Sequence, residues 1–306
     1  AAEQAVRAAG EHLPSRELKP SARPAMDTAT TPTTAGMLRT AGADLYYEVR
    51  GTGPMLLISQ SGEGDAGRST DLVDRLVADY TVVTYDRRGL SRSVPDDPAG
   101  GVSIAAHADD VHRLLAELSD EPVLMLGCSL GASIGLHLAV DHPGQISVLV
   151  AHEPVTPRLL PADQRLRHER ELAHIQRVYR RDGLAATFAT IADVLGIDPA
   201  GPDVEPGLTR HPMTPQRARN FDFFIKHDFT AVIEDTLDVA ALTGTPTRIV
   251  PAFGRTTPRT VFDSECAFAL ADLLGAEPRE FPGGHNGNTT HPRAYAAALR
   301  TALGAP

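Results

Sequence analysis

The 306-residue chain has no tryptophan and only two cysteines. Two cysteines cannot form the disulfide framework of a small secreted protein, and Cys128 lies in a glycine-rich turn that a bridge would not fit. No cluster of Cys and His has the spacing of metal ligands, so we expect no metal and no other cofactor. No apolar run approaches the length of a membrane span. We therefore expect a cytoplasmic protein without a targeting signal.

Positive charge is also scarce. The chain has 29 Lys and Arg against 39 Asp and Glu, which gives a net charge of −10. Nucleic acids and anionic membranes would be repelled by such a chain, so we expect neither as a partner. A small-molecule substrate is the expected partner, and the oligomeric state stays open. The apolar content of 42% is typical of a globular protein that is long enough to bury a large core.

The stretch from Val123 to Val140 is the one around which the chain is organised. Its first four residues are an unbroken apolar run, which predicts a buried strand, and the residues after Gly131 have helical spacing. Between them stands Gly127-Cys-Ser-Leu-Gly131, a G-x-S-x-G pattern. Strand, pattern and helix in this order are typical of a nucleophile elbow, in which two glycines permit a tight turn that raises the serine hydroxyl above the sheet. Ser129 is therefore the predicted nucleophile.

Buried strands alternate with helices along most of the chain. Strands are predicted at 45–50, 55–59, 81–86, 123–126, 146–151, 247–253 and 278–282. Ser103 is the predicted N-cap of a helix that reaches Leu118. Such alternation is typical of a mostly parallel central sheet with helices on both faces, so the predicted fold class is α/β.

The alternation fails in two places, which divide the chain. Residues 1–36 are rich in Ala, Pro and Thr and are predicted to be a flexible arm, with a short helix over 1–9. Residues 157–238 are helical and charged, which predicts a helical cap inserted before the last strands, so that 37–156 and 239–306 form the core. The apolar residues of the cap either pack it on itself or line a substrate pocket. We expect the second role for some of the four clustered phenylalanines Phe221, Phe223, Phe224 and Phe229, and predict Phe221 and Phe224 as substrate contacts.

Together these pieces resemble the α/β-hydrolase fold over about residues 37–303. The resemblance rests on the stretch 85–93, on the G-x-S-x-G pattern and on Phe281-Pro-Gly-Gly-His-Asn-Gly287. The last stretch is similar to the loop that carries the family's general base, which would make His285 the base. The family also uses two backbone donors as an oxyanion hole, of which the first would be the N–H of Leu130. This chain has Gln60-Ser-Gly62 where the family usually has His-Gly-X. Gly62 is the expected second donor, with Glu63 as its alternative and as a substrate contact.

The acid of the predicted triad is harder to place. The family's usual acid follows the strand 247–253, but the loop 254–260 contains no carboxylate. Asp263 comes later, and we expect it to be the N-cap of a helix over 264–274. Glu153 directly follows the strand after the elbow, a position that some α/β-hydrolases, among them the zearalenone lactonases, use for their acid. We predict this role for Glu153, although local pairing with His152 or an arginine is the alternative.

Zearalenone lactonases are similar to this chain in three stretches, 61–65, 82–93 and 150–154. They open a resorcylic macrolactone under a cap tryptophan, which a Phe or Tyr would have to replace here. The prediction is a serine hydrolase that cleaves an ester or lactone of a small, fairly apolar molecule through an acyl-enzyme on Ser129. The alternative is a member with a degraded triad that binds a ligand or performs a non-hydrolytic step. Haloalkane dehalogenases and epoxide hydrolases are disfavoured because they use an aspartate where Ser129 stands.

Overall fold

A nine-stranded sheet forms the centre of residues 32–197 and 203–304, which the computed structural model describes. The strand order is β1-β2-β4-β3-β6-β7-β8-β9, with β5 paired to β2. The strands β3, β4, β6, β7, β8 and β9 pair with one another in parallel, whereas β2 pairs antiparallel with β1, β4 and β5. Their bounds are Thr33–Thr40 (β1), Ala43–Gly51 (β2), Met55–Ser59 (β3), Thr81–Tyr85 (β4), Val94–Pro95 (β5), Val123–Cys128 (β6), Ile146–His152 (β7), Arg248–Gly254 (β8) and Arg279–Phe281 (β9).

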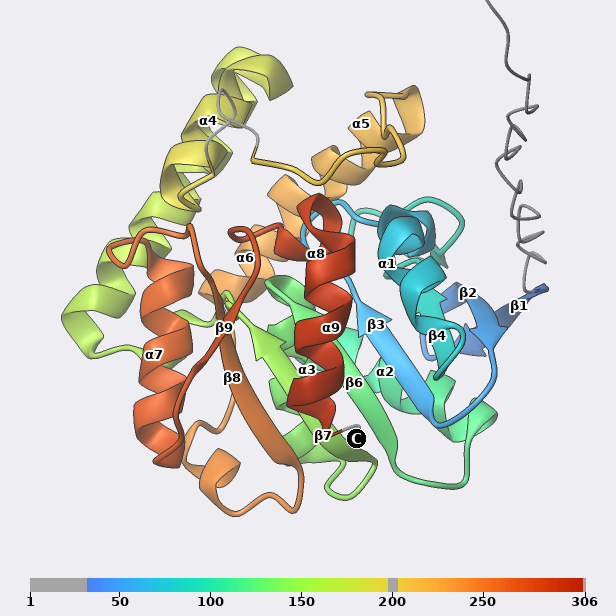
Figure 1. Ribbon diagram of the computed structural model, residues 1–306. Helices are drawn as coiled ribbons and strands as arrows, with labels where there is room; N and C mark the ends of the chain where they lie inside the picture. Colours follow the sequence, from blue (N-terminus) through green and yellow to red (C-terminus); the bar gives the residue numbers. More distant parts are fainter. Residues whose placement is uncertain (1–31, 198–202, 305–306) are drawn as a thin grey trace, which may run out of the picture. The chain divides into compact units, whose positions relative to one another are not determined.

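Helices cover both faces of this sheet (Figure 1). Their apolar residues divide the core into two clusters, because α1 and α9 pack on one face while α2 and α3 pack on the other. The bounds are Ala66–Ser69 (η1), Thr70–Leu76 (α1), Ile104–Leu118 (α2), Leu130–Asp141 (α3), Phe262–Leu274 (α7), Gly287–Thr290 (α8) and Pro292–Leu303 (α9). Ser103 caps α2 as predicted, since its hydroxyl accepts a hydrogen bond of 3.0 Å from the Ala106 N–H.

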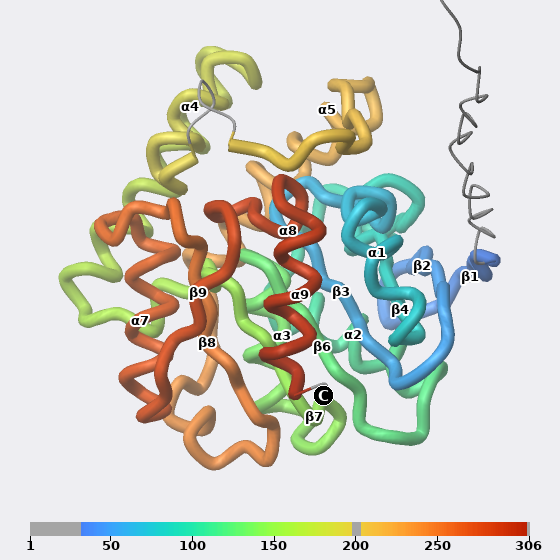
Figure 2. The backbone as a smooth tube through the Cα atoms, viewed as in Figure 1, coloured from blue at the N-terminus to red at the C-terminus, as the bar shows by residue number. Residues whose placement is uncertain are grey.

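A helical insertion separates β7 from β8. It contains η2 (Pro157–Leu159), α4 (Ala162–Val194), α5 (Pro215–Phe223), the π-helical turn η3 (Phe224–Asp228), α6 (Phe229–Ile233) and η4 (Ala240–Thr243). In Figure 2 its helices α4 and α5 lie beyond the end of the sheet at which β3 and β6 finish. The helix α4 is interrupted at Gly183, whose φ of 78° leaves the helical region. The predicted α/β class, with helices inserted before the last strands, is confirmed.

The predicted strands are all present, and their ends differ by at most two residues from those expected. The strand β1 was not predicted, and it begins at Thr33, so residues 33–36 of the predicted arm belong to the sheet. Most of its residues are exposed and its first four are small, so the strand lacks an apolar run or a clear apolar periodicity. The rest of the arm, including the expected helix over 1–9, lies outside the described residues. Among the helices that the structure describes, none is both long enough and apolar enough to cross a bilayer.

Candidate active site

Ser129 occupies a strained turn between β6 and α3. Its φ is 54° and its ψ is −116°, values that a residue with a side chain seldom adopts. The glycines on either side are required by close backbone contacts. A Cβ on Gly131 would lie 2.0 Å from the carbonyl oxygen of Ser59, and one on Gly127 would lie 2.6 Å from Ala132 Cα. The turn therefore has the geometry that the G-x-S-x-G pattern predicts.

His285 and Glu153 are brought together from two separate turns. His285 lies between β9 and α8, and its Nδ1 is 2.8 Å from Oε2 of Glu153, which directly follows β7. The other carboxylate oxygen, Oε1, accepts a hydrogen bond of 2.7 Å from the Gly254 N–H. Glu153 itself has a φ of 45°, so the backbone is strained at the acid as well as at the serine. The geometric requirement for Glu153 as the acid is thus met.

The alternative partner, His152, is otherwise engaged. Its Nε2 is 4.0 Å from Glu153 Oε2, while its Nδ1 is 3.0 Å from the hydroxyl of Tyr295. Burial lowers the pKa of His152 to about 4, so this ring is neutral near pH 7. Glu153 therefore faces a neutral ring on one side and His285 on the other.

Asp263 is not the N-cap that the sequence suggested. The helix α7 begins at Phe262, with Val261 at its N-cap, so Asp263 lies in the first turn. Its Oδ2 is 2.6 Å from His285 Nδ1, the same nitrogen that Glu153 contacts. The expectation that Asp263 is an N-cap, away from the base, was therefore wrong. The strand β8 and its loop return the start of α7 to the base, which sequence distance does not reveal.

The three ionisable groups form a cluster that is closed to solvent, since each is at most 3% exposed. Burial alone would raise the pKa of Glu153, but the hydrogen bond from His285 and the neighbouring imidazoles outweigh it and lower the pKa to about 2. The pKa of Asp263 shifts in the opposite direction. Burial and the Glu153 charge raise it to about 6, despite the opposing effect of His285. Burial would lower the pKa of His285, but the two carboxylates overcome that effect and raise it. Glu153 is therefore the carboxylate that stays ionised, and Asp263 the one that takes up a proton first.

Among the residues that the structure describes, this cluster is the only group of His, Cys, Asp and Glu side chains close enough together to hold a metal ion. Its donor atoms lie within 4.8 Å of one another. The side chains that supply them are all buried. A cation there would have no open coordination position for a substrate, so the cluster suits proton sharing better than metal catalysis.

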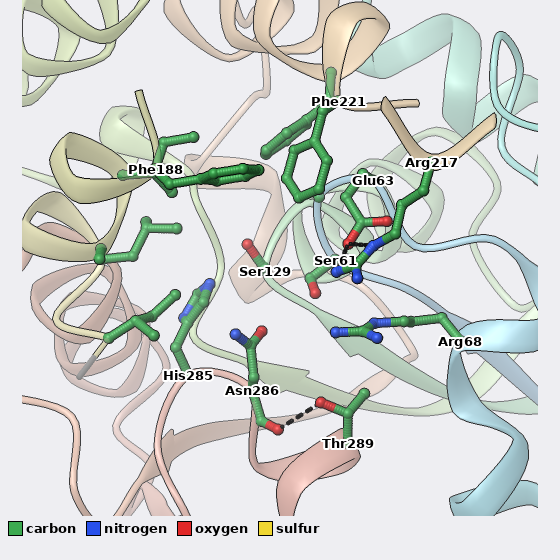
Figure 3. A pocket seen from close by; sticks show the side chains of 16 residues that line it. Ser61, Glu63, Arg68, Ser129, Phe188, Arg217, Phe221, His285, Asn286 and Thr289 are labelled. Carbon is green, nitrogen blue, oxygen red and sulfur yellow. Dashed lines mark hydrogen bonds and ion pairs between the residues drawn. The ribbon is translucent and has the colours of Figure 1, made fainter. Parts of the chain in front are cut away.

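The opposite nitrogen of His285 faces a cavity of about 310 Å³, which Ser129 also lines (Figure 3). Nε2 of His285 makes no hydrogen bond to any residue that the structure describes, and this includes the Ser129 hydroxyl. Such a bond often forms only when substrate is bound, so the free nitrogen is compatible with a role as base.

The cavity has one apolar wall, supplied by the insertion. Phe188 of α4 and Phe221 of α5 meet edge to face there, with ring centroids 4.9 Å apart. Phe221 and Phe224 both line the cavity, as predicted. Phe223 and Phe229 are not among its lining residues: the ring of Phe223 packs beside Gly89, and Phe229 is buried against Phe224. The other apolar lining residues are Ile191, Ala192, Leu195 and Ile197.

The two predicted oxyanion donors are the backbone N–H groups of Leu130 and Gly62. Leu130 is the first residue of α3, so its N–H has no acceptor within the helix. Gly62 lines the cavity with a φ of 46°, and its carbonyl oxygen accepts a hydrogen bond from Arg87. Arg87 also donates to the carbonyl of Gln60 at 3.2 Å, which fixes the loop after β3. Glu63 lines the cavity too, but its carboxylate is paired with Arg217 at 2.7 Å.

Several polar residues of the cavity were not predicted from the sequence. They are Arg68, Arg217, Asn286 and Thr289. Arg68 and Arg217 come from η1 and α5, segments far apart in the chain, and neither stands in a motif. The pattern around His285 identified its loop, but nothing indicated that Asn286 and Thr289 face the same cavity.

Comparison with known proteins identifies the family. Residues 56–195 match the model of the family described as alpha/beta hydrolase fold. The uncharacterized hydrolase YraK of Bacillus subtilis (strain 168) is 34% identical to this chain, over 88% of this chain and 95% of that protein. The chain belongs to the α/β hydrolase fold family. The predicted resemblance is thereby confirmed at the level of the family, whereas the likeness to zearalenone lactonases stays a prediction.

Two solved structures share the fold of this α/β hydrolase. A putative epoxide hydrolase from Pseudomonas aeruginosa is 23% identical, with a TM-score of 0.65 over 89% of this chain and 97% of that one. Est816, described as an N-acyl homoserine lactone degrading enzyme, is 22% identical, with a TM-score of 0.63 over 87% of this chain and 99% of that one. At such identities the likeness extends to the fold and not to the substrate.

Proposed function

We propose that this α/β hydrolase cleaves an ester or lactone bond of a small, fairly apolar molecule through an acyl-enzyme on Ser129. The observation that carries the proposal is the path from Glu153 through His285 to the cavity. One imidazole nitrogen lies 2.8 Å from a buried carboxylate, and the other faces the cavity that Ser129 lines. This is the arrangement that activates a serine hydroxyl.

In the proposed reaction His285 Nε2 takes the proton of the Ser129 hydroxyl as the oxygen attacks the carbonyl carbon. The hydrogen bond from Nδ1–H to Glu153 holds the ring in the required tautomer and stabilises the imidazolium. The backbone N–H groups of Leu130 and Gly62 would receive the negative oxygen. The imidazolium then protonates the leaving alcohol, and water, activated by the same nitrogen, releases the acid from Ser129.

The cavity supports a small and largely apolar substrate. Its volume of about 310 Å³ lies at the lower end of ligand-binding cavities, and Phe188 and Phe221 form its aromatic wall. A lactone of the zearalenone type is the narrower form of the proposal, with these two rings in place of the missing tryptophan. An epoxide hydrolase of the aspartate type is not supported, because a serine stands at the elbow.

A fluorophosphonate probe followed by mass spectrometry tests the nucleophile. We expect one adduct on Ser129 in the wild type and none in Ser129→Ala, with hydrolysis of a panel of acyl and lactone substrates lost in the same variant. Equal thermal melting of both proteins would show that the fold is intact. Wild-type protein that neither takes up the probe nor turns over any substrate, but still binds apolar esters, would instead support a ligand-binding protein with a degraded triad.

A further inference from the structure

Arg68 differs in its hydrogen-bond and ion-pair partners from the other arginines that are not exposed. It belongs to η1, it is not exposed, and it lines the cavity beside Ser129. Every other arginine that is not exposed has a hydrogen-bond or ion-pair partner, as Arg87 has in Asp228 and Arg88 in Asp110. Among the residues that the structure describes, no acceptor lies within hydrogen-bond or ion-pair distance of the Arg68 guanidinium.

The two acids whose charges act on Arg68 are Glu63 and Asp65, and both are hydrogen-bonded to other groups. Glu63 is paired with Arg217 at 2.7 Å. Asp65 accepts hydrogen bonds from the Gly67 N–H at 3.1 Å and from the Ser91 hydroxyl at 2.7 Å. Because Glu63 neutralises Arg217, the polar wall retains the single positive charge of Arg68. Burial lowers the pKa of Arg68, as expected for a charge taken from water without a partner.

The free guanidinium points into the cavity. Figure 3 shows the Arg68 side chain directed toward the centre of the cavity, with Phe188 on the opposite side of Ser129 and Phe221 between Phe188 and Arg217. The cavity is therefore amphipathic, with apolar side chains from the insertion and a cationic wall at Arg68, which comes from η1 after β3. A guanidinium presents a rigid fork of donors that matches a carboxylate in two parallel hydrogen bonds.

We propose that Arg68 binds a carboxylate of the substrate, so that the enzyme hydrolyses an ester or lactone which carries a free carboxylic acid. This inference rests on the proposed hydrolysis at Ser129 and adds the chemical class of the substrate. The apolar part of the molecule packs on Phe188 and Phe221 while the carboxylate occupies the cationic wall. A substrate carboxylate would supply the direct ion-pair partner that Arg68 lacks among the described residues.

Two 4-nitrophenyl esters of adipic acid test this class, one with the second carboxyl free and the other with it converted to the carboxamide. The two differ in charge but hardly in size. In the wild type we expect kcat/KM to be about ten- to a hundredfold higher for the free acid, the range of a hydrogen bond to a charged group. Arg68→Gln should remove most of this ratio, and Arg68→Lys should keep part of it. Arg75→Gln, an exposed arginine of the neighbouring helix α1, is the matched control and should keep the ratio unchanged.

Binding to Ser129→Ala provides a readout that needs no turnover. Titration with monomethyl adipate and with its carboxamide should give a lower Kd for the acid, and Arg68→Gln in the same background should abolish the difference. Equal values for acid and amide, or a preference that survives Arg68→Gln in a folded protein, would overturn the proposal. If the wild type hydrolysed neither ester, but Ser129→Ala still bound the acid more tightly than the carboxamide, only the proposed function would be refuted. Hydrolysis of both esters at equal rates would refute the carboxylate site alone.

Discussion

At His285 two buried carboxylates compete for one imidazole N–H. Glu153 Oε2 lies 2.8 Å and Asp263 Oδ2 lies 2.6 Å from Nδ1. One N–H cannot point at both oxygens, and two adjacent carboxylates cannot both be ionised at low cost. The opposite pKa shifts of the two acids resolve this conflict by keeping Glu153 charged while Asp263 takes up a proton more easily. We therefore propose that Glu153 is the acid that orients the base and that Asp263 adjusts the proton affinity of the ring.

This division predicts different pH profiles for two variants. The base acts only when neutral, so kcat/KM rises with pH through the pKa of His285, which the two carboxylates raise above its ordinary value near 6.5. Asp263→Asn removes one of them, so the pKa falls and the rising limb moves to lower pH, with a plateau within about tenfold of wild type. Glu153→Gln should lower the plateau itself by about 10²- to 10⁴-fold. Steady-state kinetics between pH 5 and 10 measure both effects. The reverse pattern, with the larger plateau loss in Asp263→Asn, would make Asp263 the acid.

The elbow glycine makes a second prediction about single residues. A Cβ on Gly131 would lie 2.0 Å from the Ser59 carbonyl oxygen, and a backbone atom cannot move aside as a side-chain end can. Gly131→Ala should therefore lower the free energy of unfolding by more than about 3 kcal/mol. Gly244→Ala is a control with room for the methyl group, because its nearest atom is 3.7 Å away. It should stay within about 0.5 kcal/mol of wild type in urea denaturation. Equal stability of the two variants would contradict the contact.

At the scale of elements, a buried charge network joins the insertion to the loop after β3. Asp228 of η3 lies 2.9 Å from Arg87 and 2.8 Å from His107 Nε2. Arg87 in turn donates to the carbonyl oxygens of Gln60 and Gly62. Burial would raise the pKa of Asp228, but Arg87 and His107 outweigh it and lower the pKa. The network thus holds the expected oxyanion loop in place from the insertion.

Asp228→Asn should show this coupling. The change leaves Arg87 charged and buried without its counter-ion, which costs about 3–5 kcal/mol in the free energy of unfolding. It should also reduce kcat, because the carbonyls of the Gly62 loop lose a fixed donor. Asp222→Asn, at a half-exposed ion pair with Lys226, is the matched control and should cost at most about 1 kcal/mol. Denaturant titration and steady-state kinetics report the two effects separately. A wild-type kcat in a folded Asp228→Asn protein would disprove the link to the loop.

Elements with a regular pattern could be predicted, and positions that depend on a tertiary contact could not. The apolar runs at 55–59 and 146–151 predicted β3 and β7 because central parallel strands are buried on both faces. The edge strand β1 has no such run, and β5 has two residues. For the site, Ser129, His285 and Glu153 followed from turns after strands. Asp263 and Arg68 did not, because what brings each to its place is the path of a loop that leaves no local signature.

At the scale of the whole molecule, the charge of the chain and that of its cavity have opposite signs. The net charge is −10, yet the described cavity wall around Arg68 is cationic. Charges separated by more than about 10 Å are largely screened in physiological salt, so the local guanidinium and not the net charge decides whether an anion binds. We therefore expect the acidic composition to oppose the binding of a polyanion such as a nucleic acid more strongly than that of a small carboxylate.

The cavity exists only where the insertion meets the core, because Phe188 and Phe221 come from the one and Ser129 and His285 from the other. Removal of a ring from this wall should weaken binding of the apolar part of a substrate in the ground state and in the transition state alike. Phe221→Ala is therefore expected to raise KM for an apolar ester about tenfold, with kcat changed by less than about threefold. Leu166→Ala, at a 47% exposed position of α4, is the control and should leave both constants at wild-type values. Initial rates over a range of ester chain lengths should show the KM effect growing with chain length. A fall in kcat at constant KM would mean that Phe221 supports the reacting groups and does not bind the apolar part of the substrate.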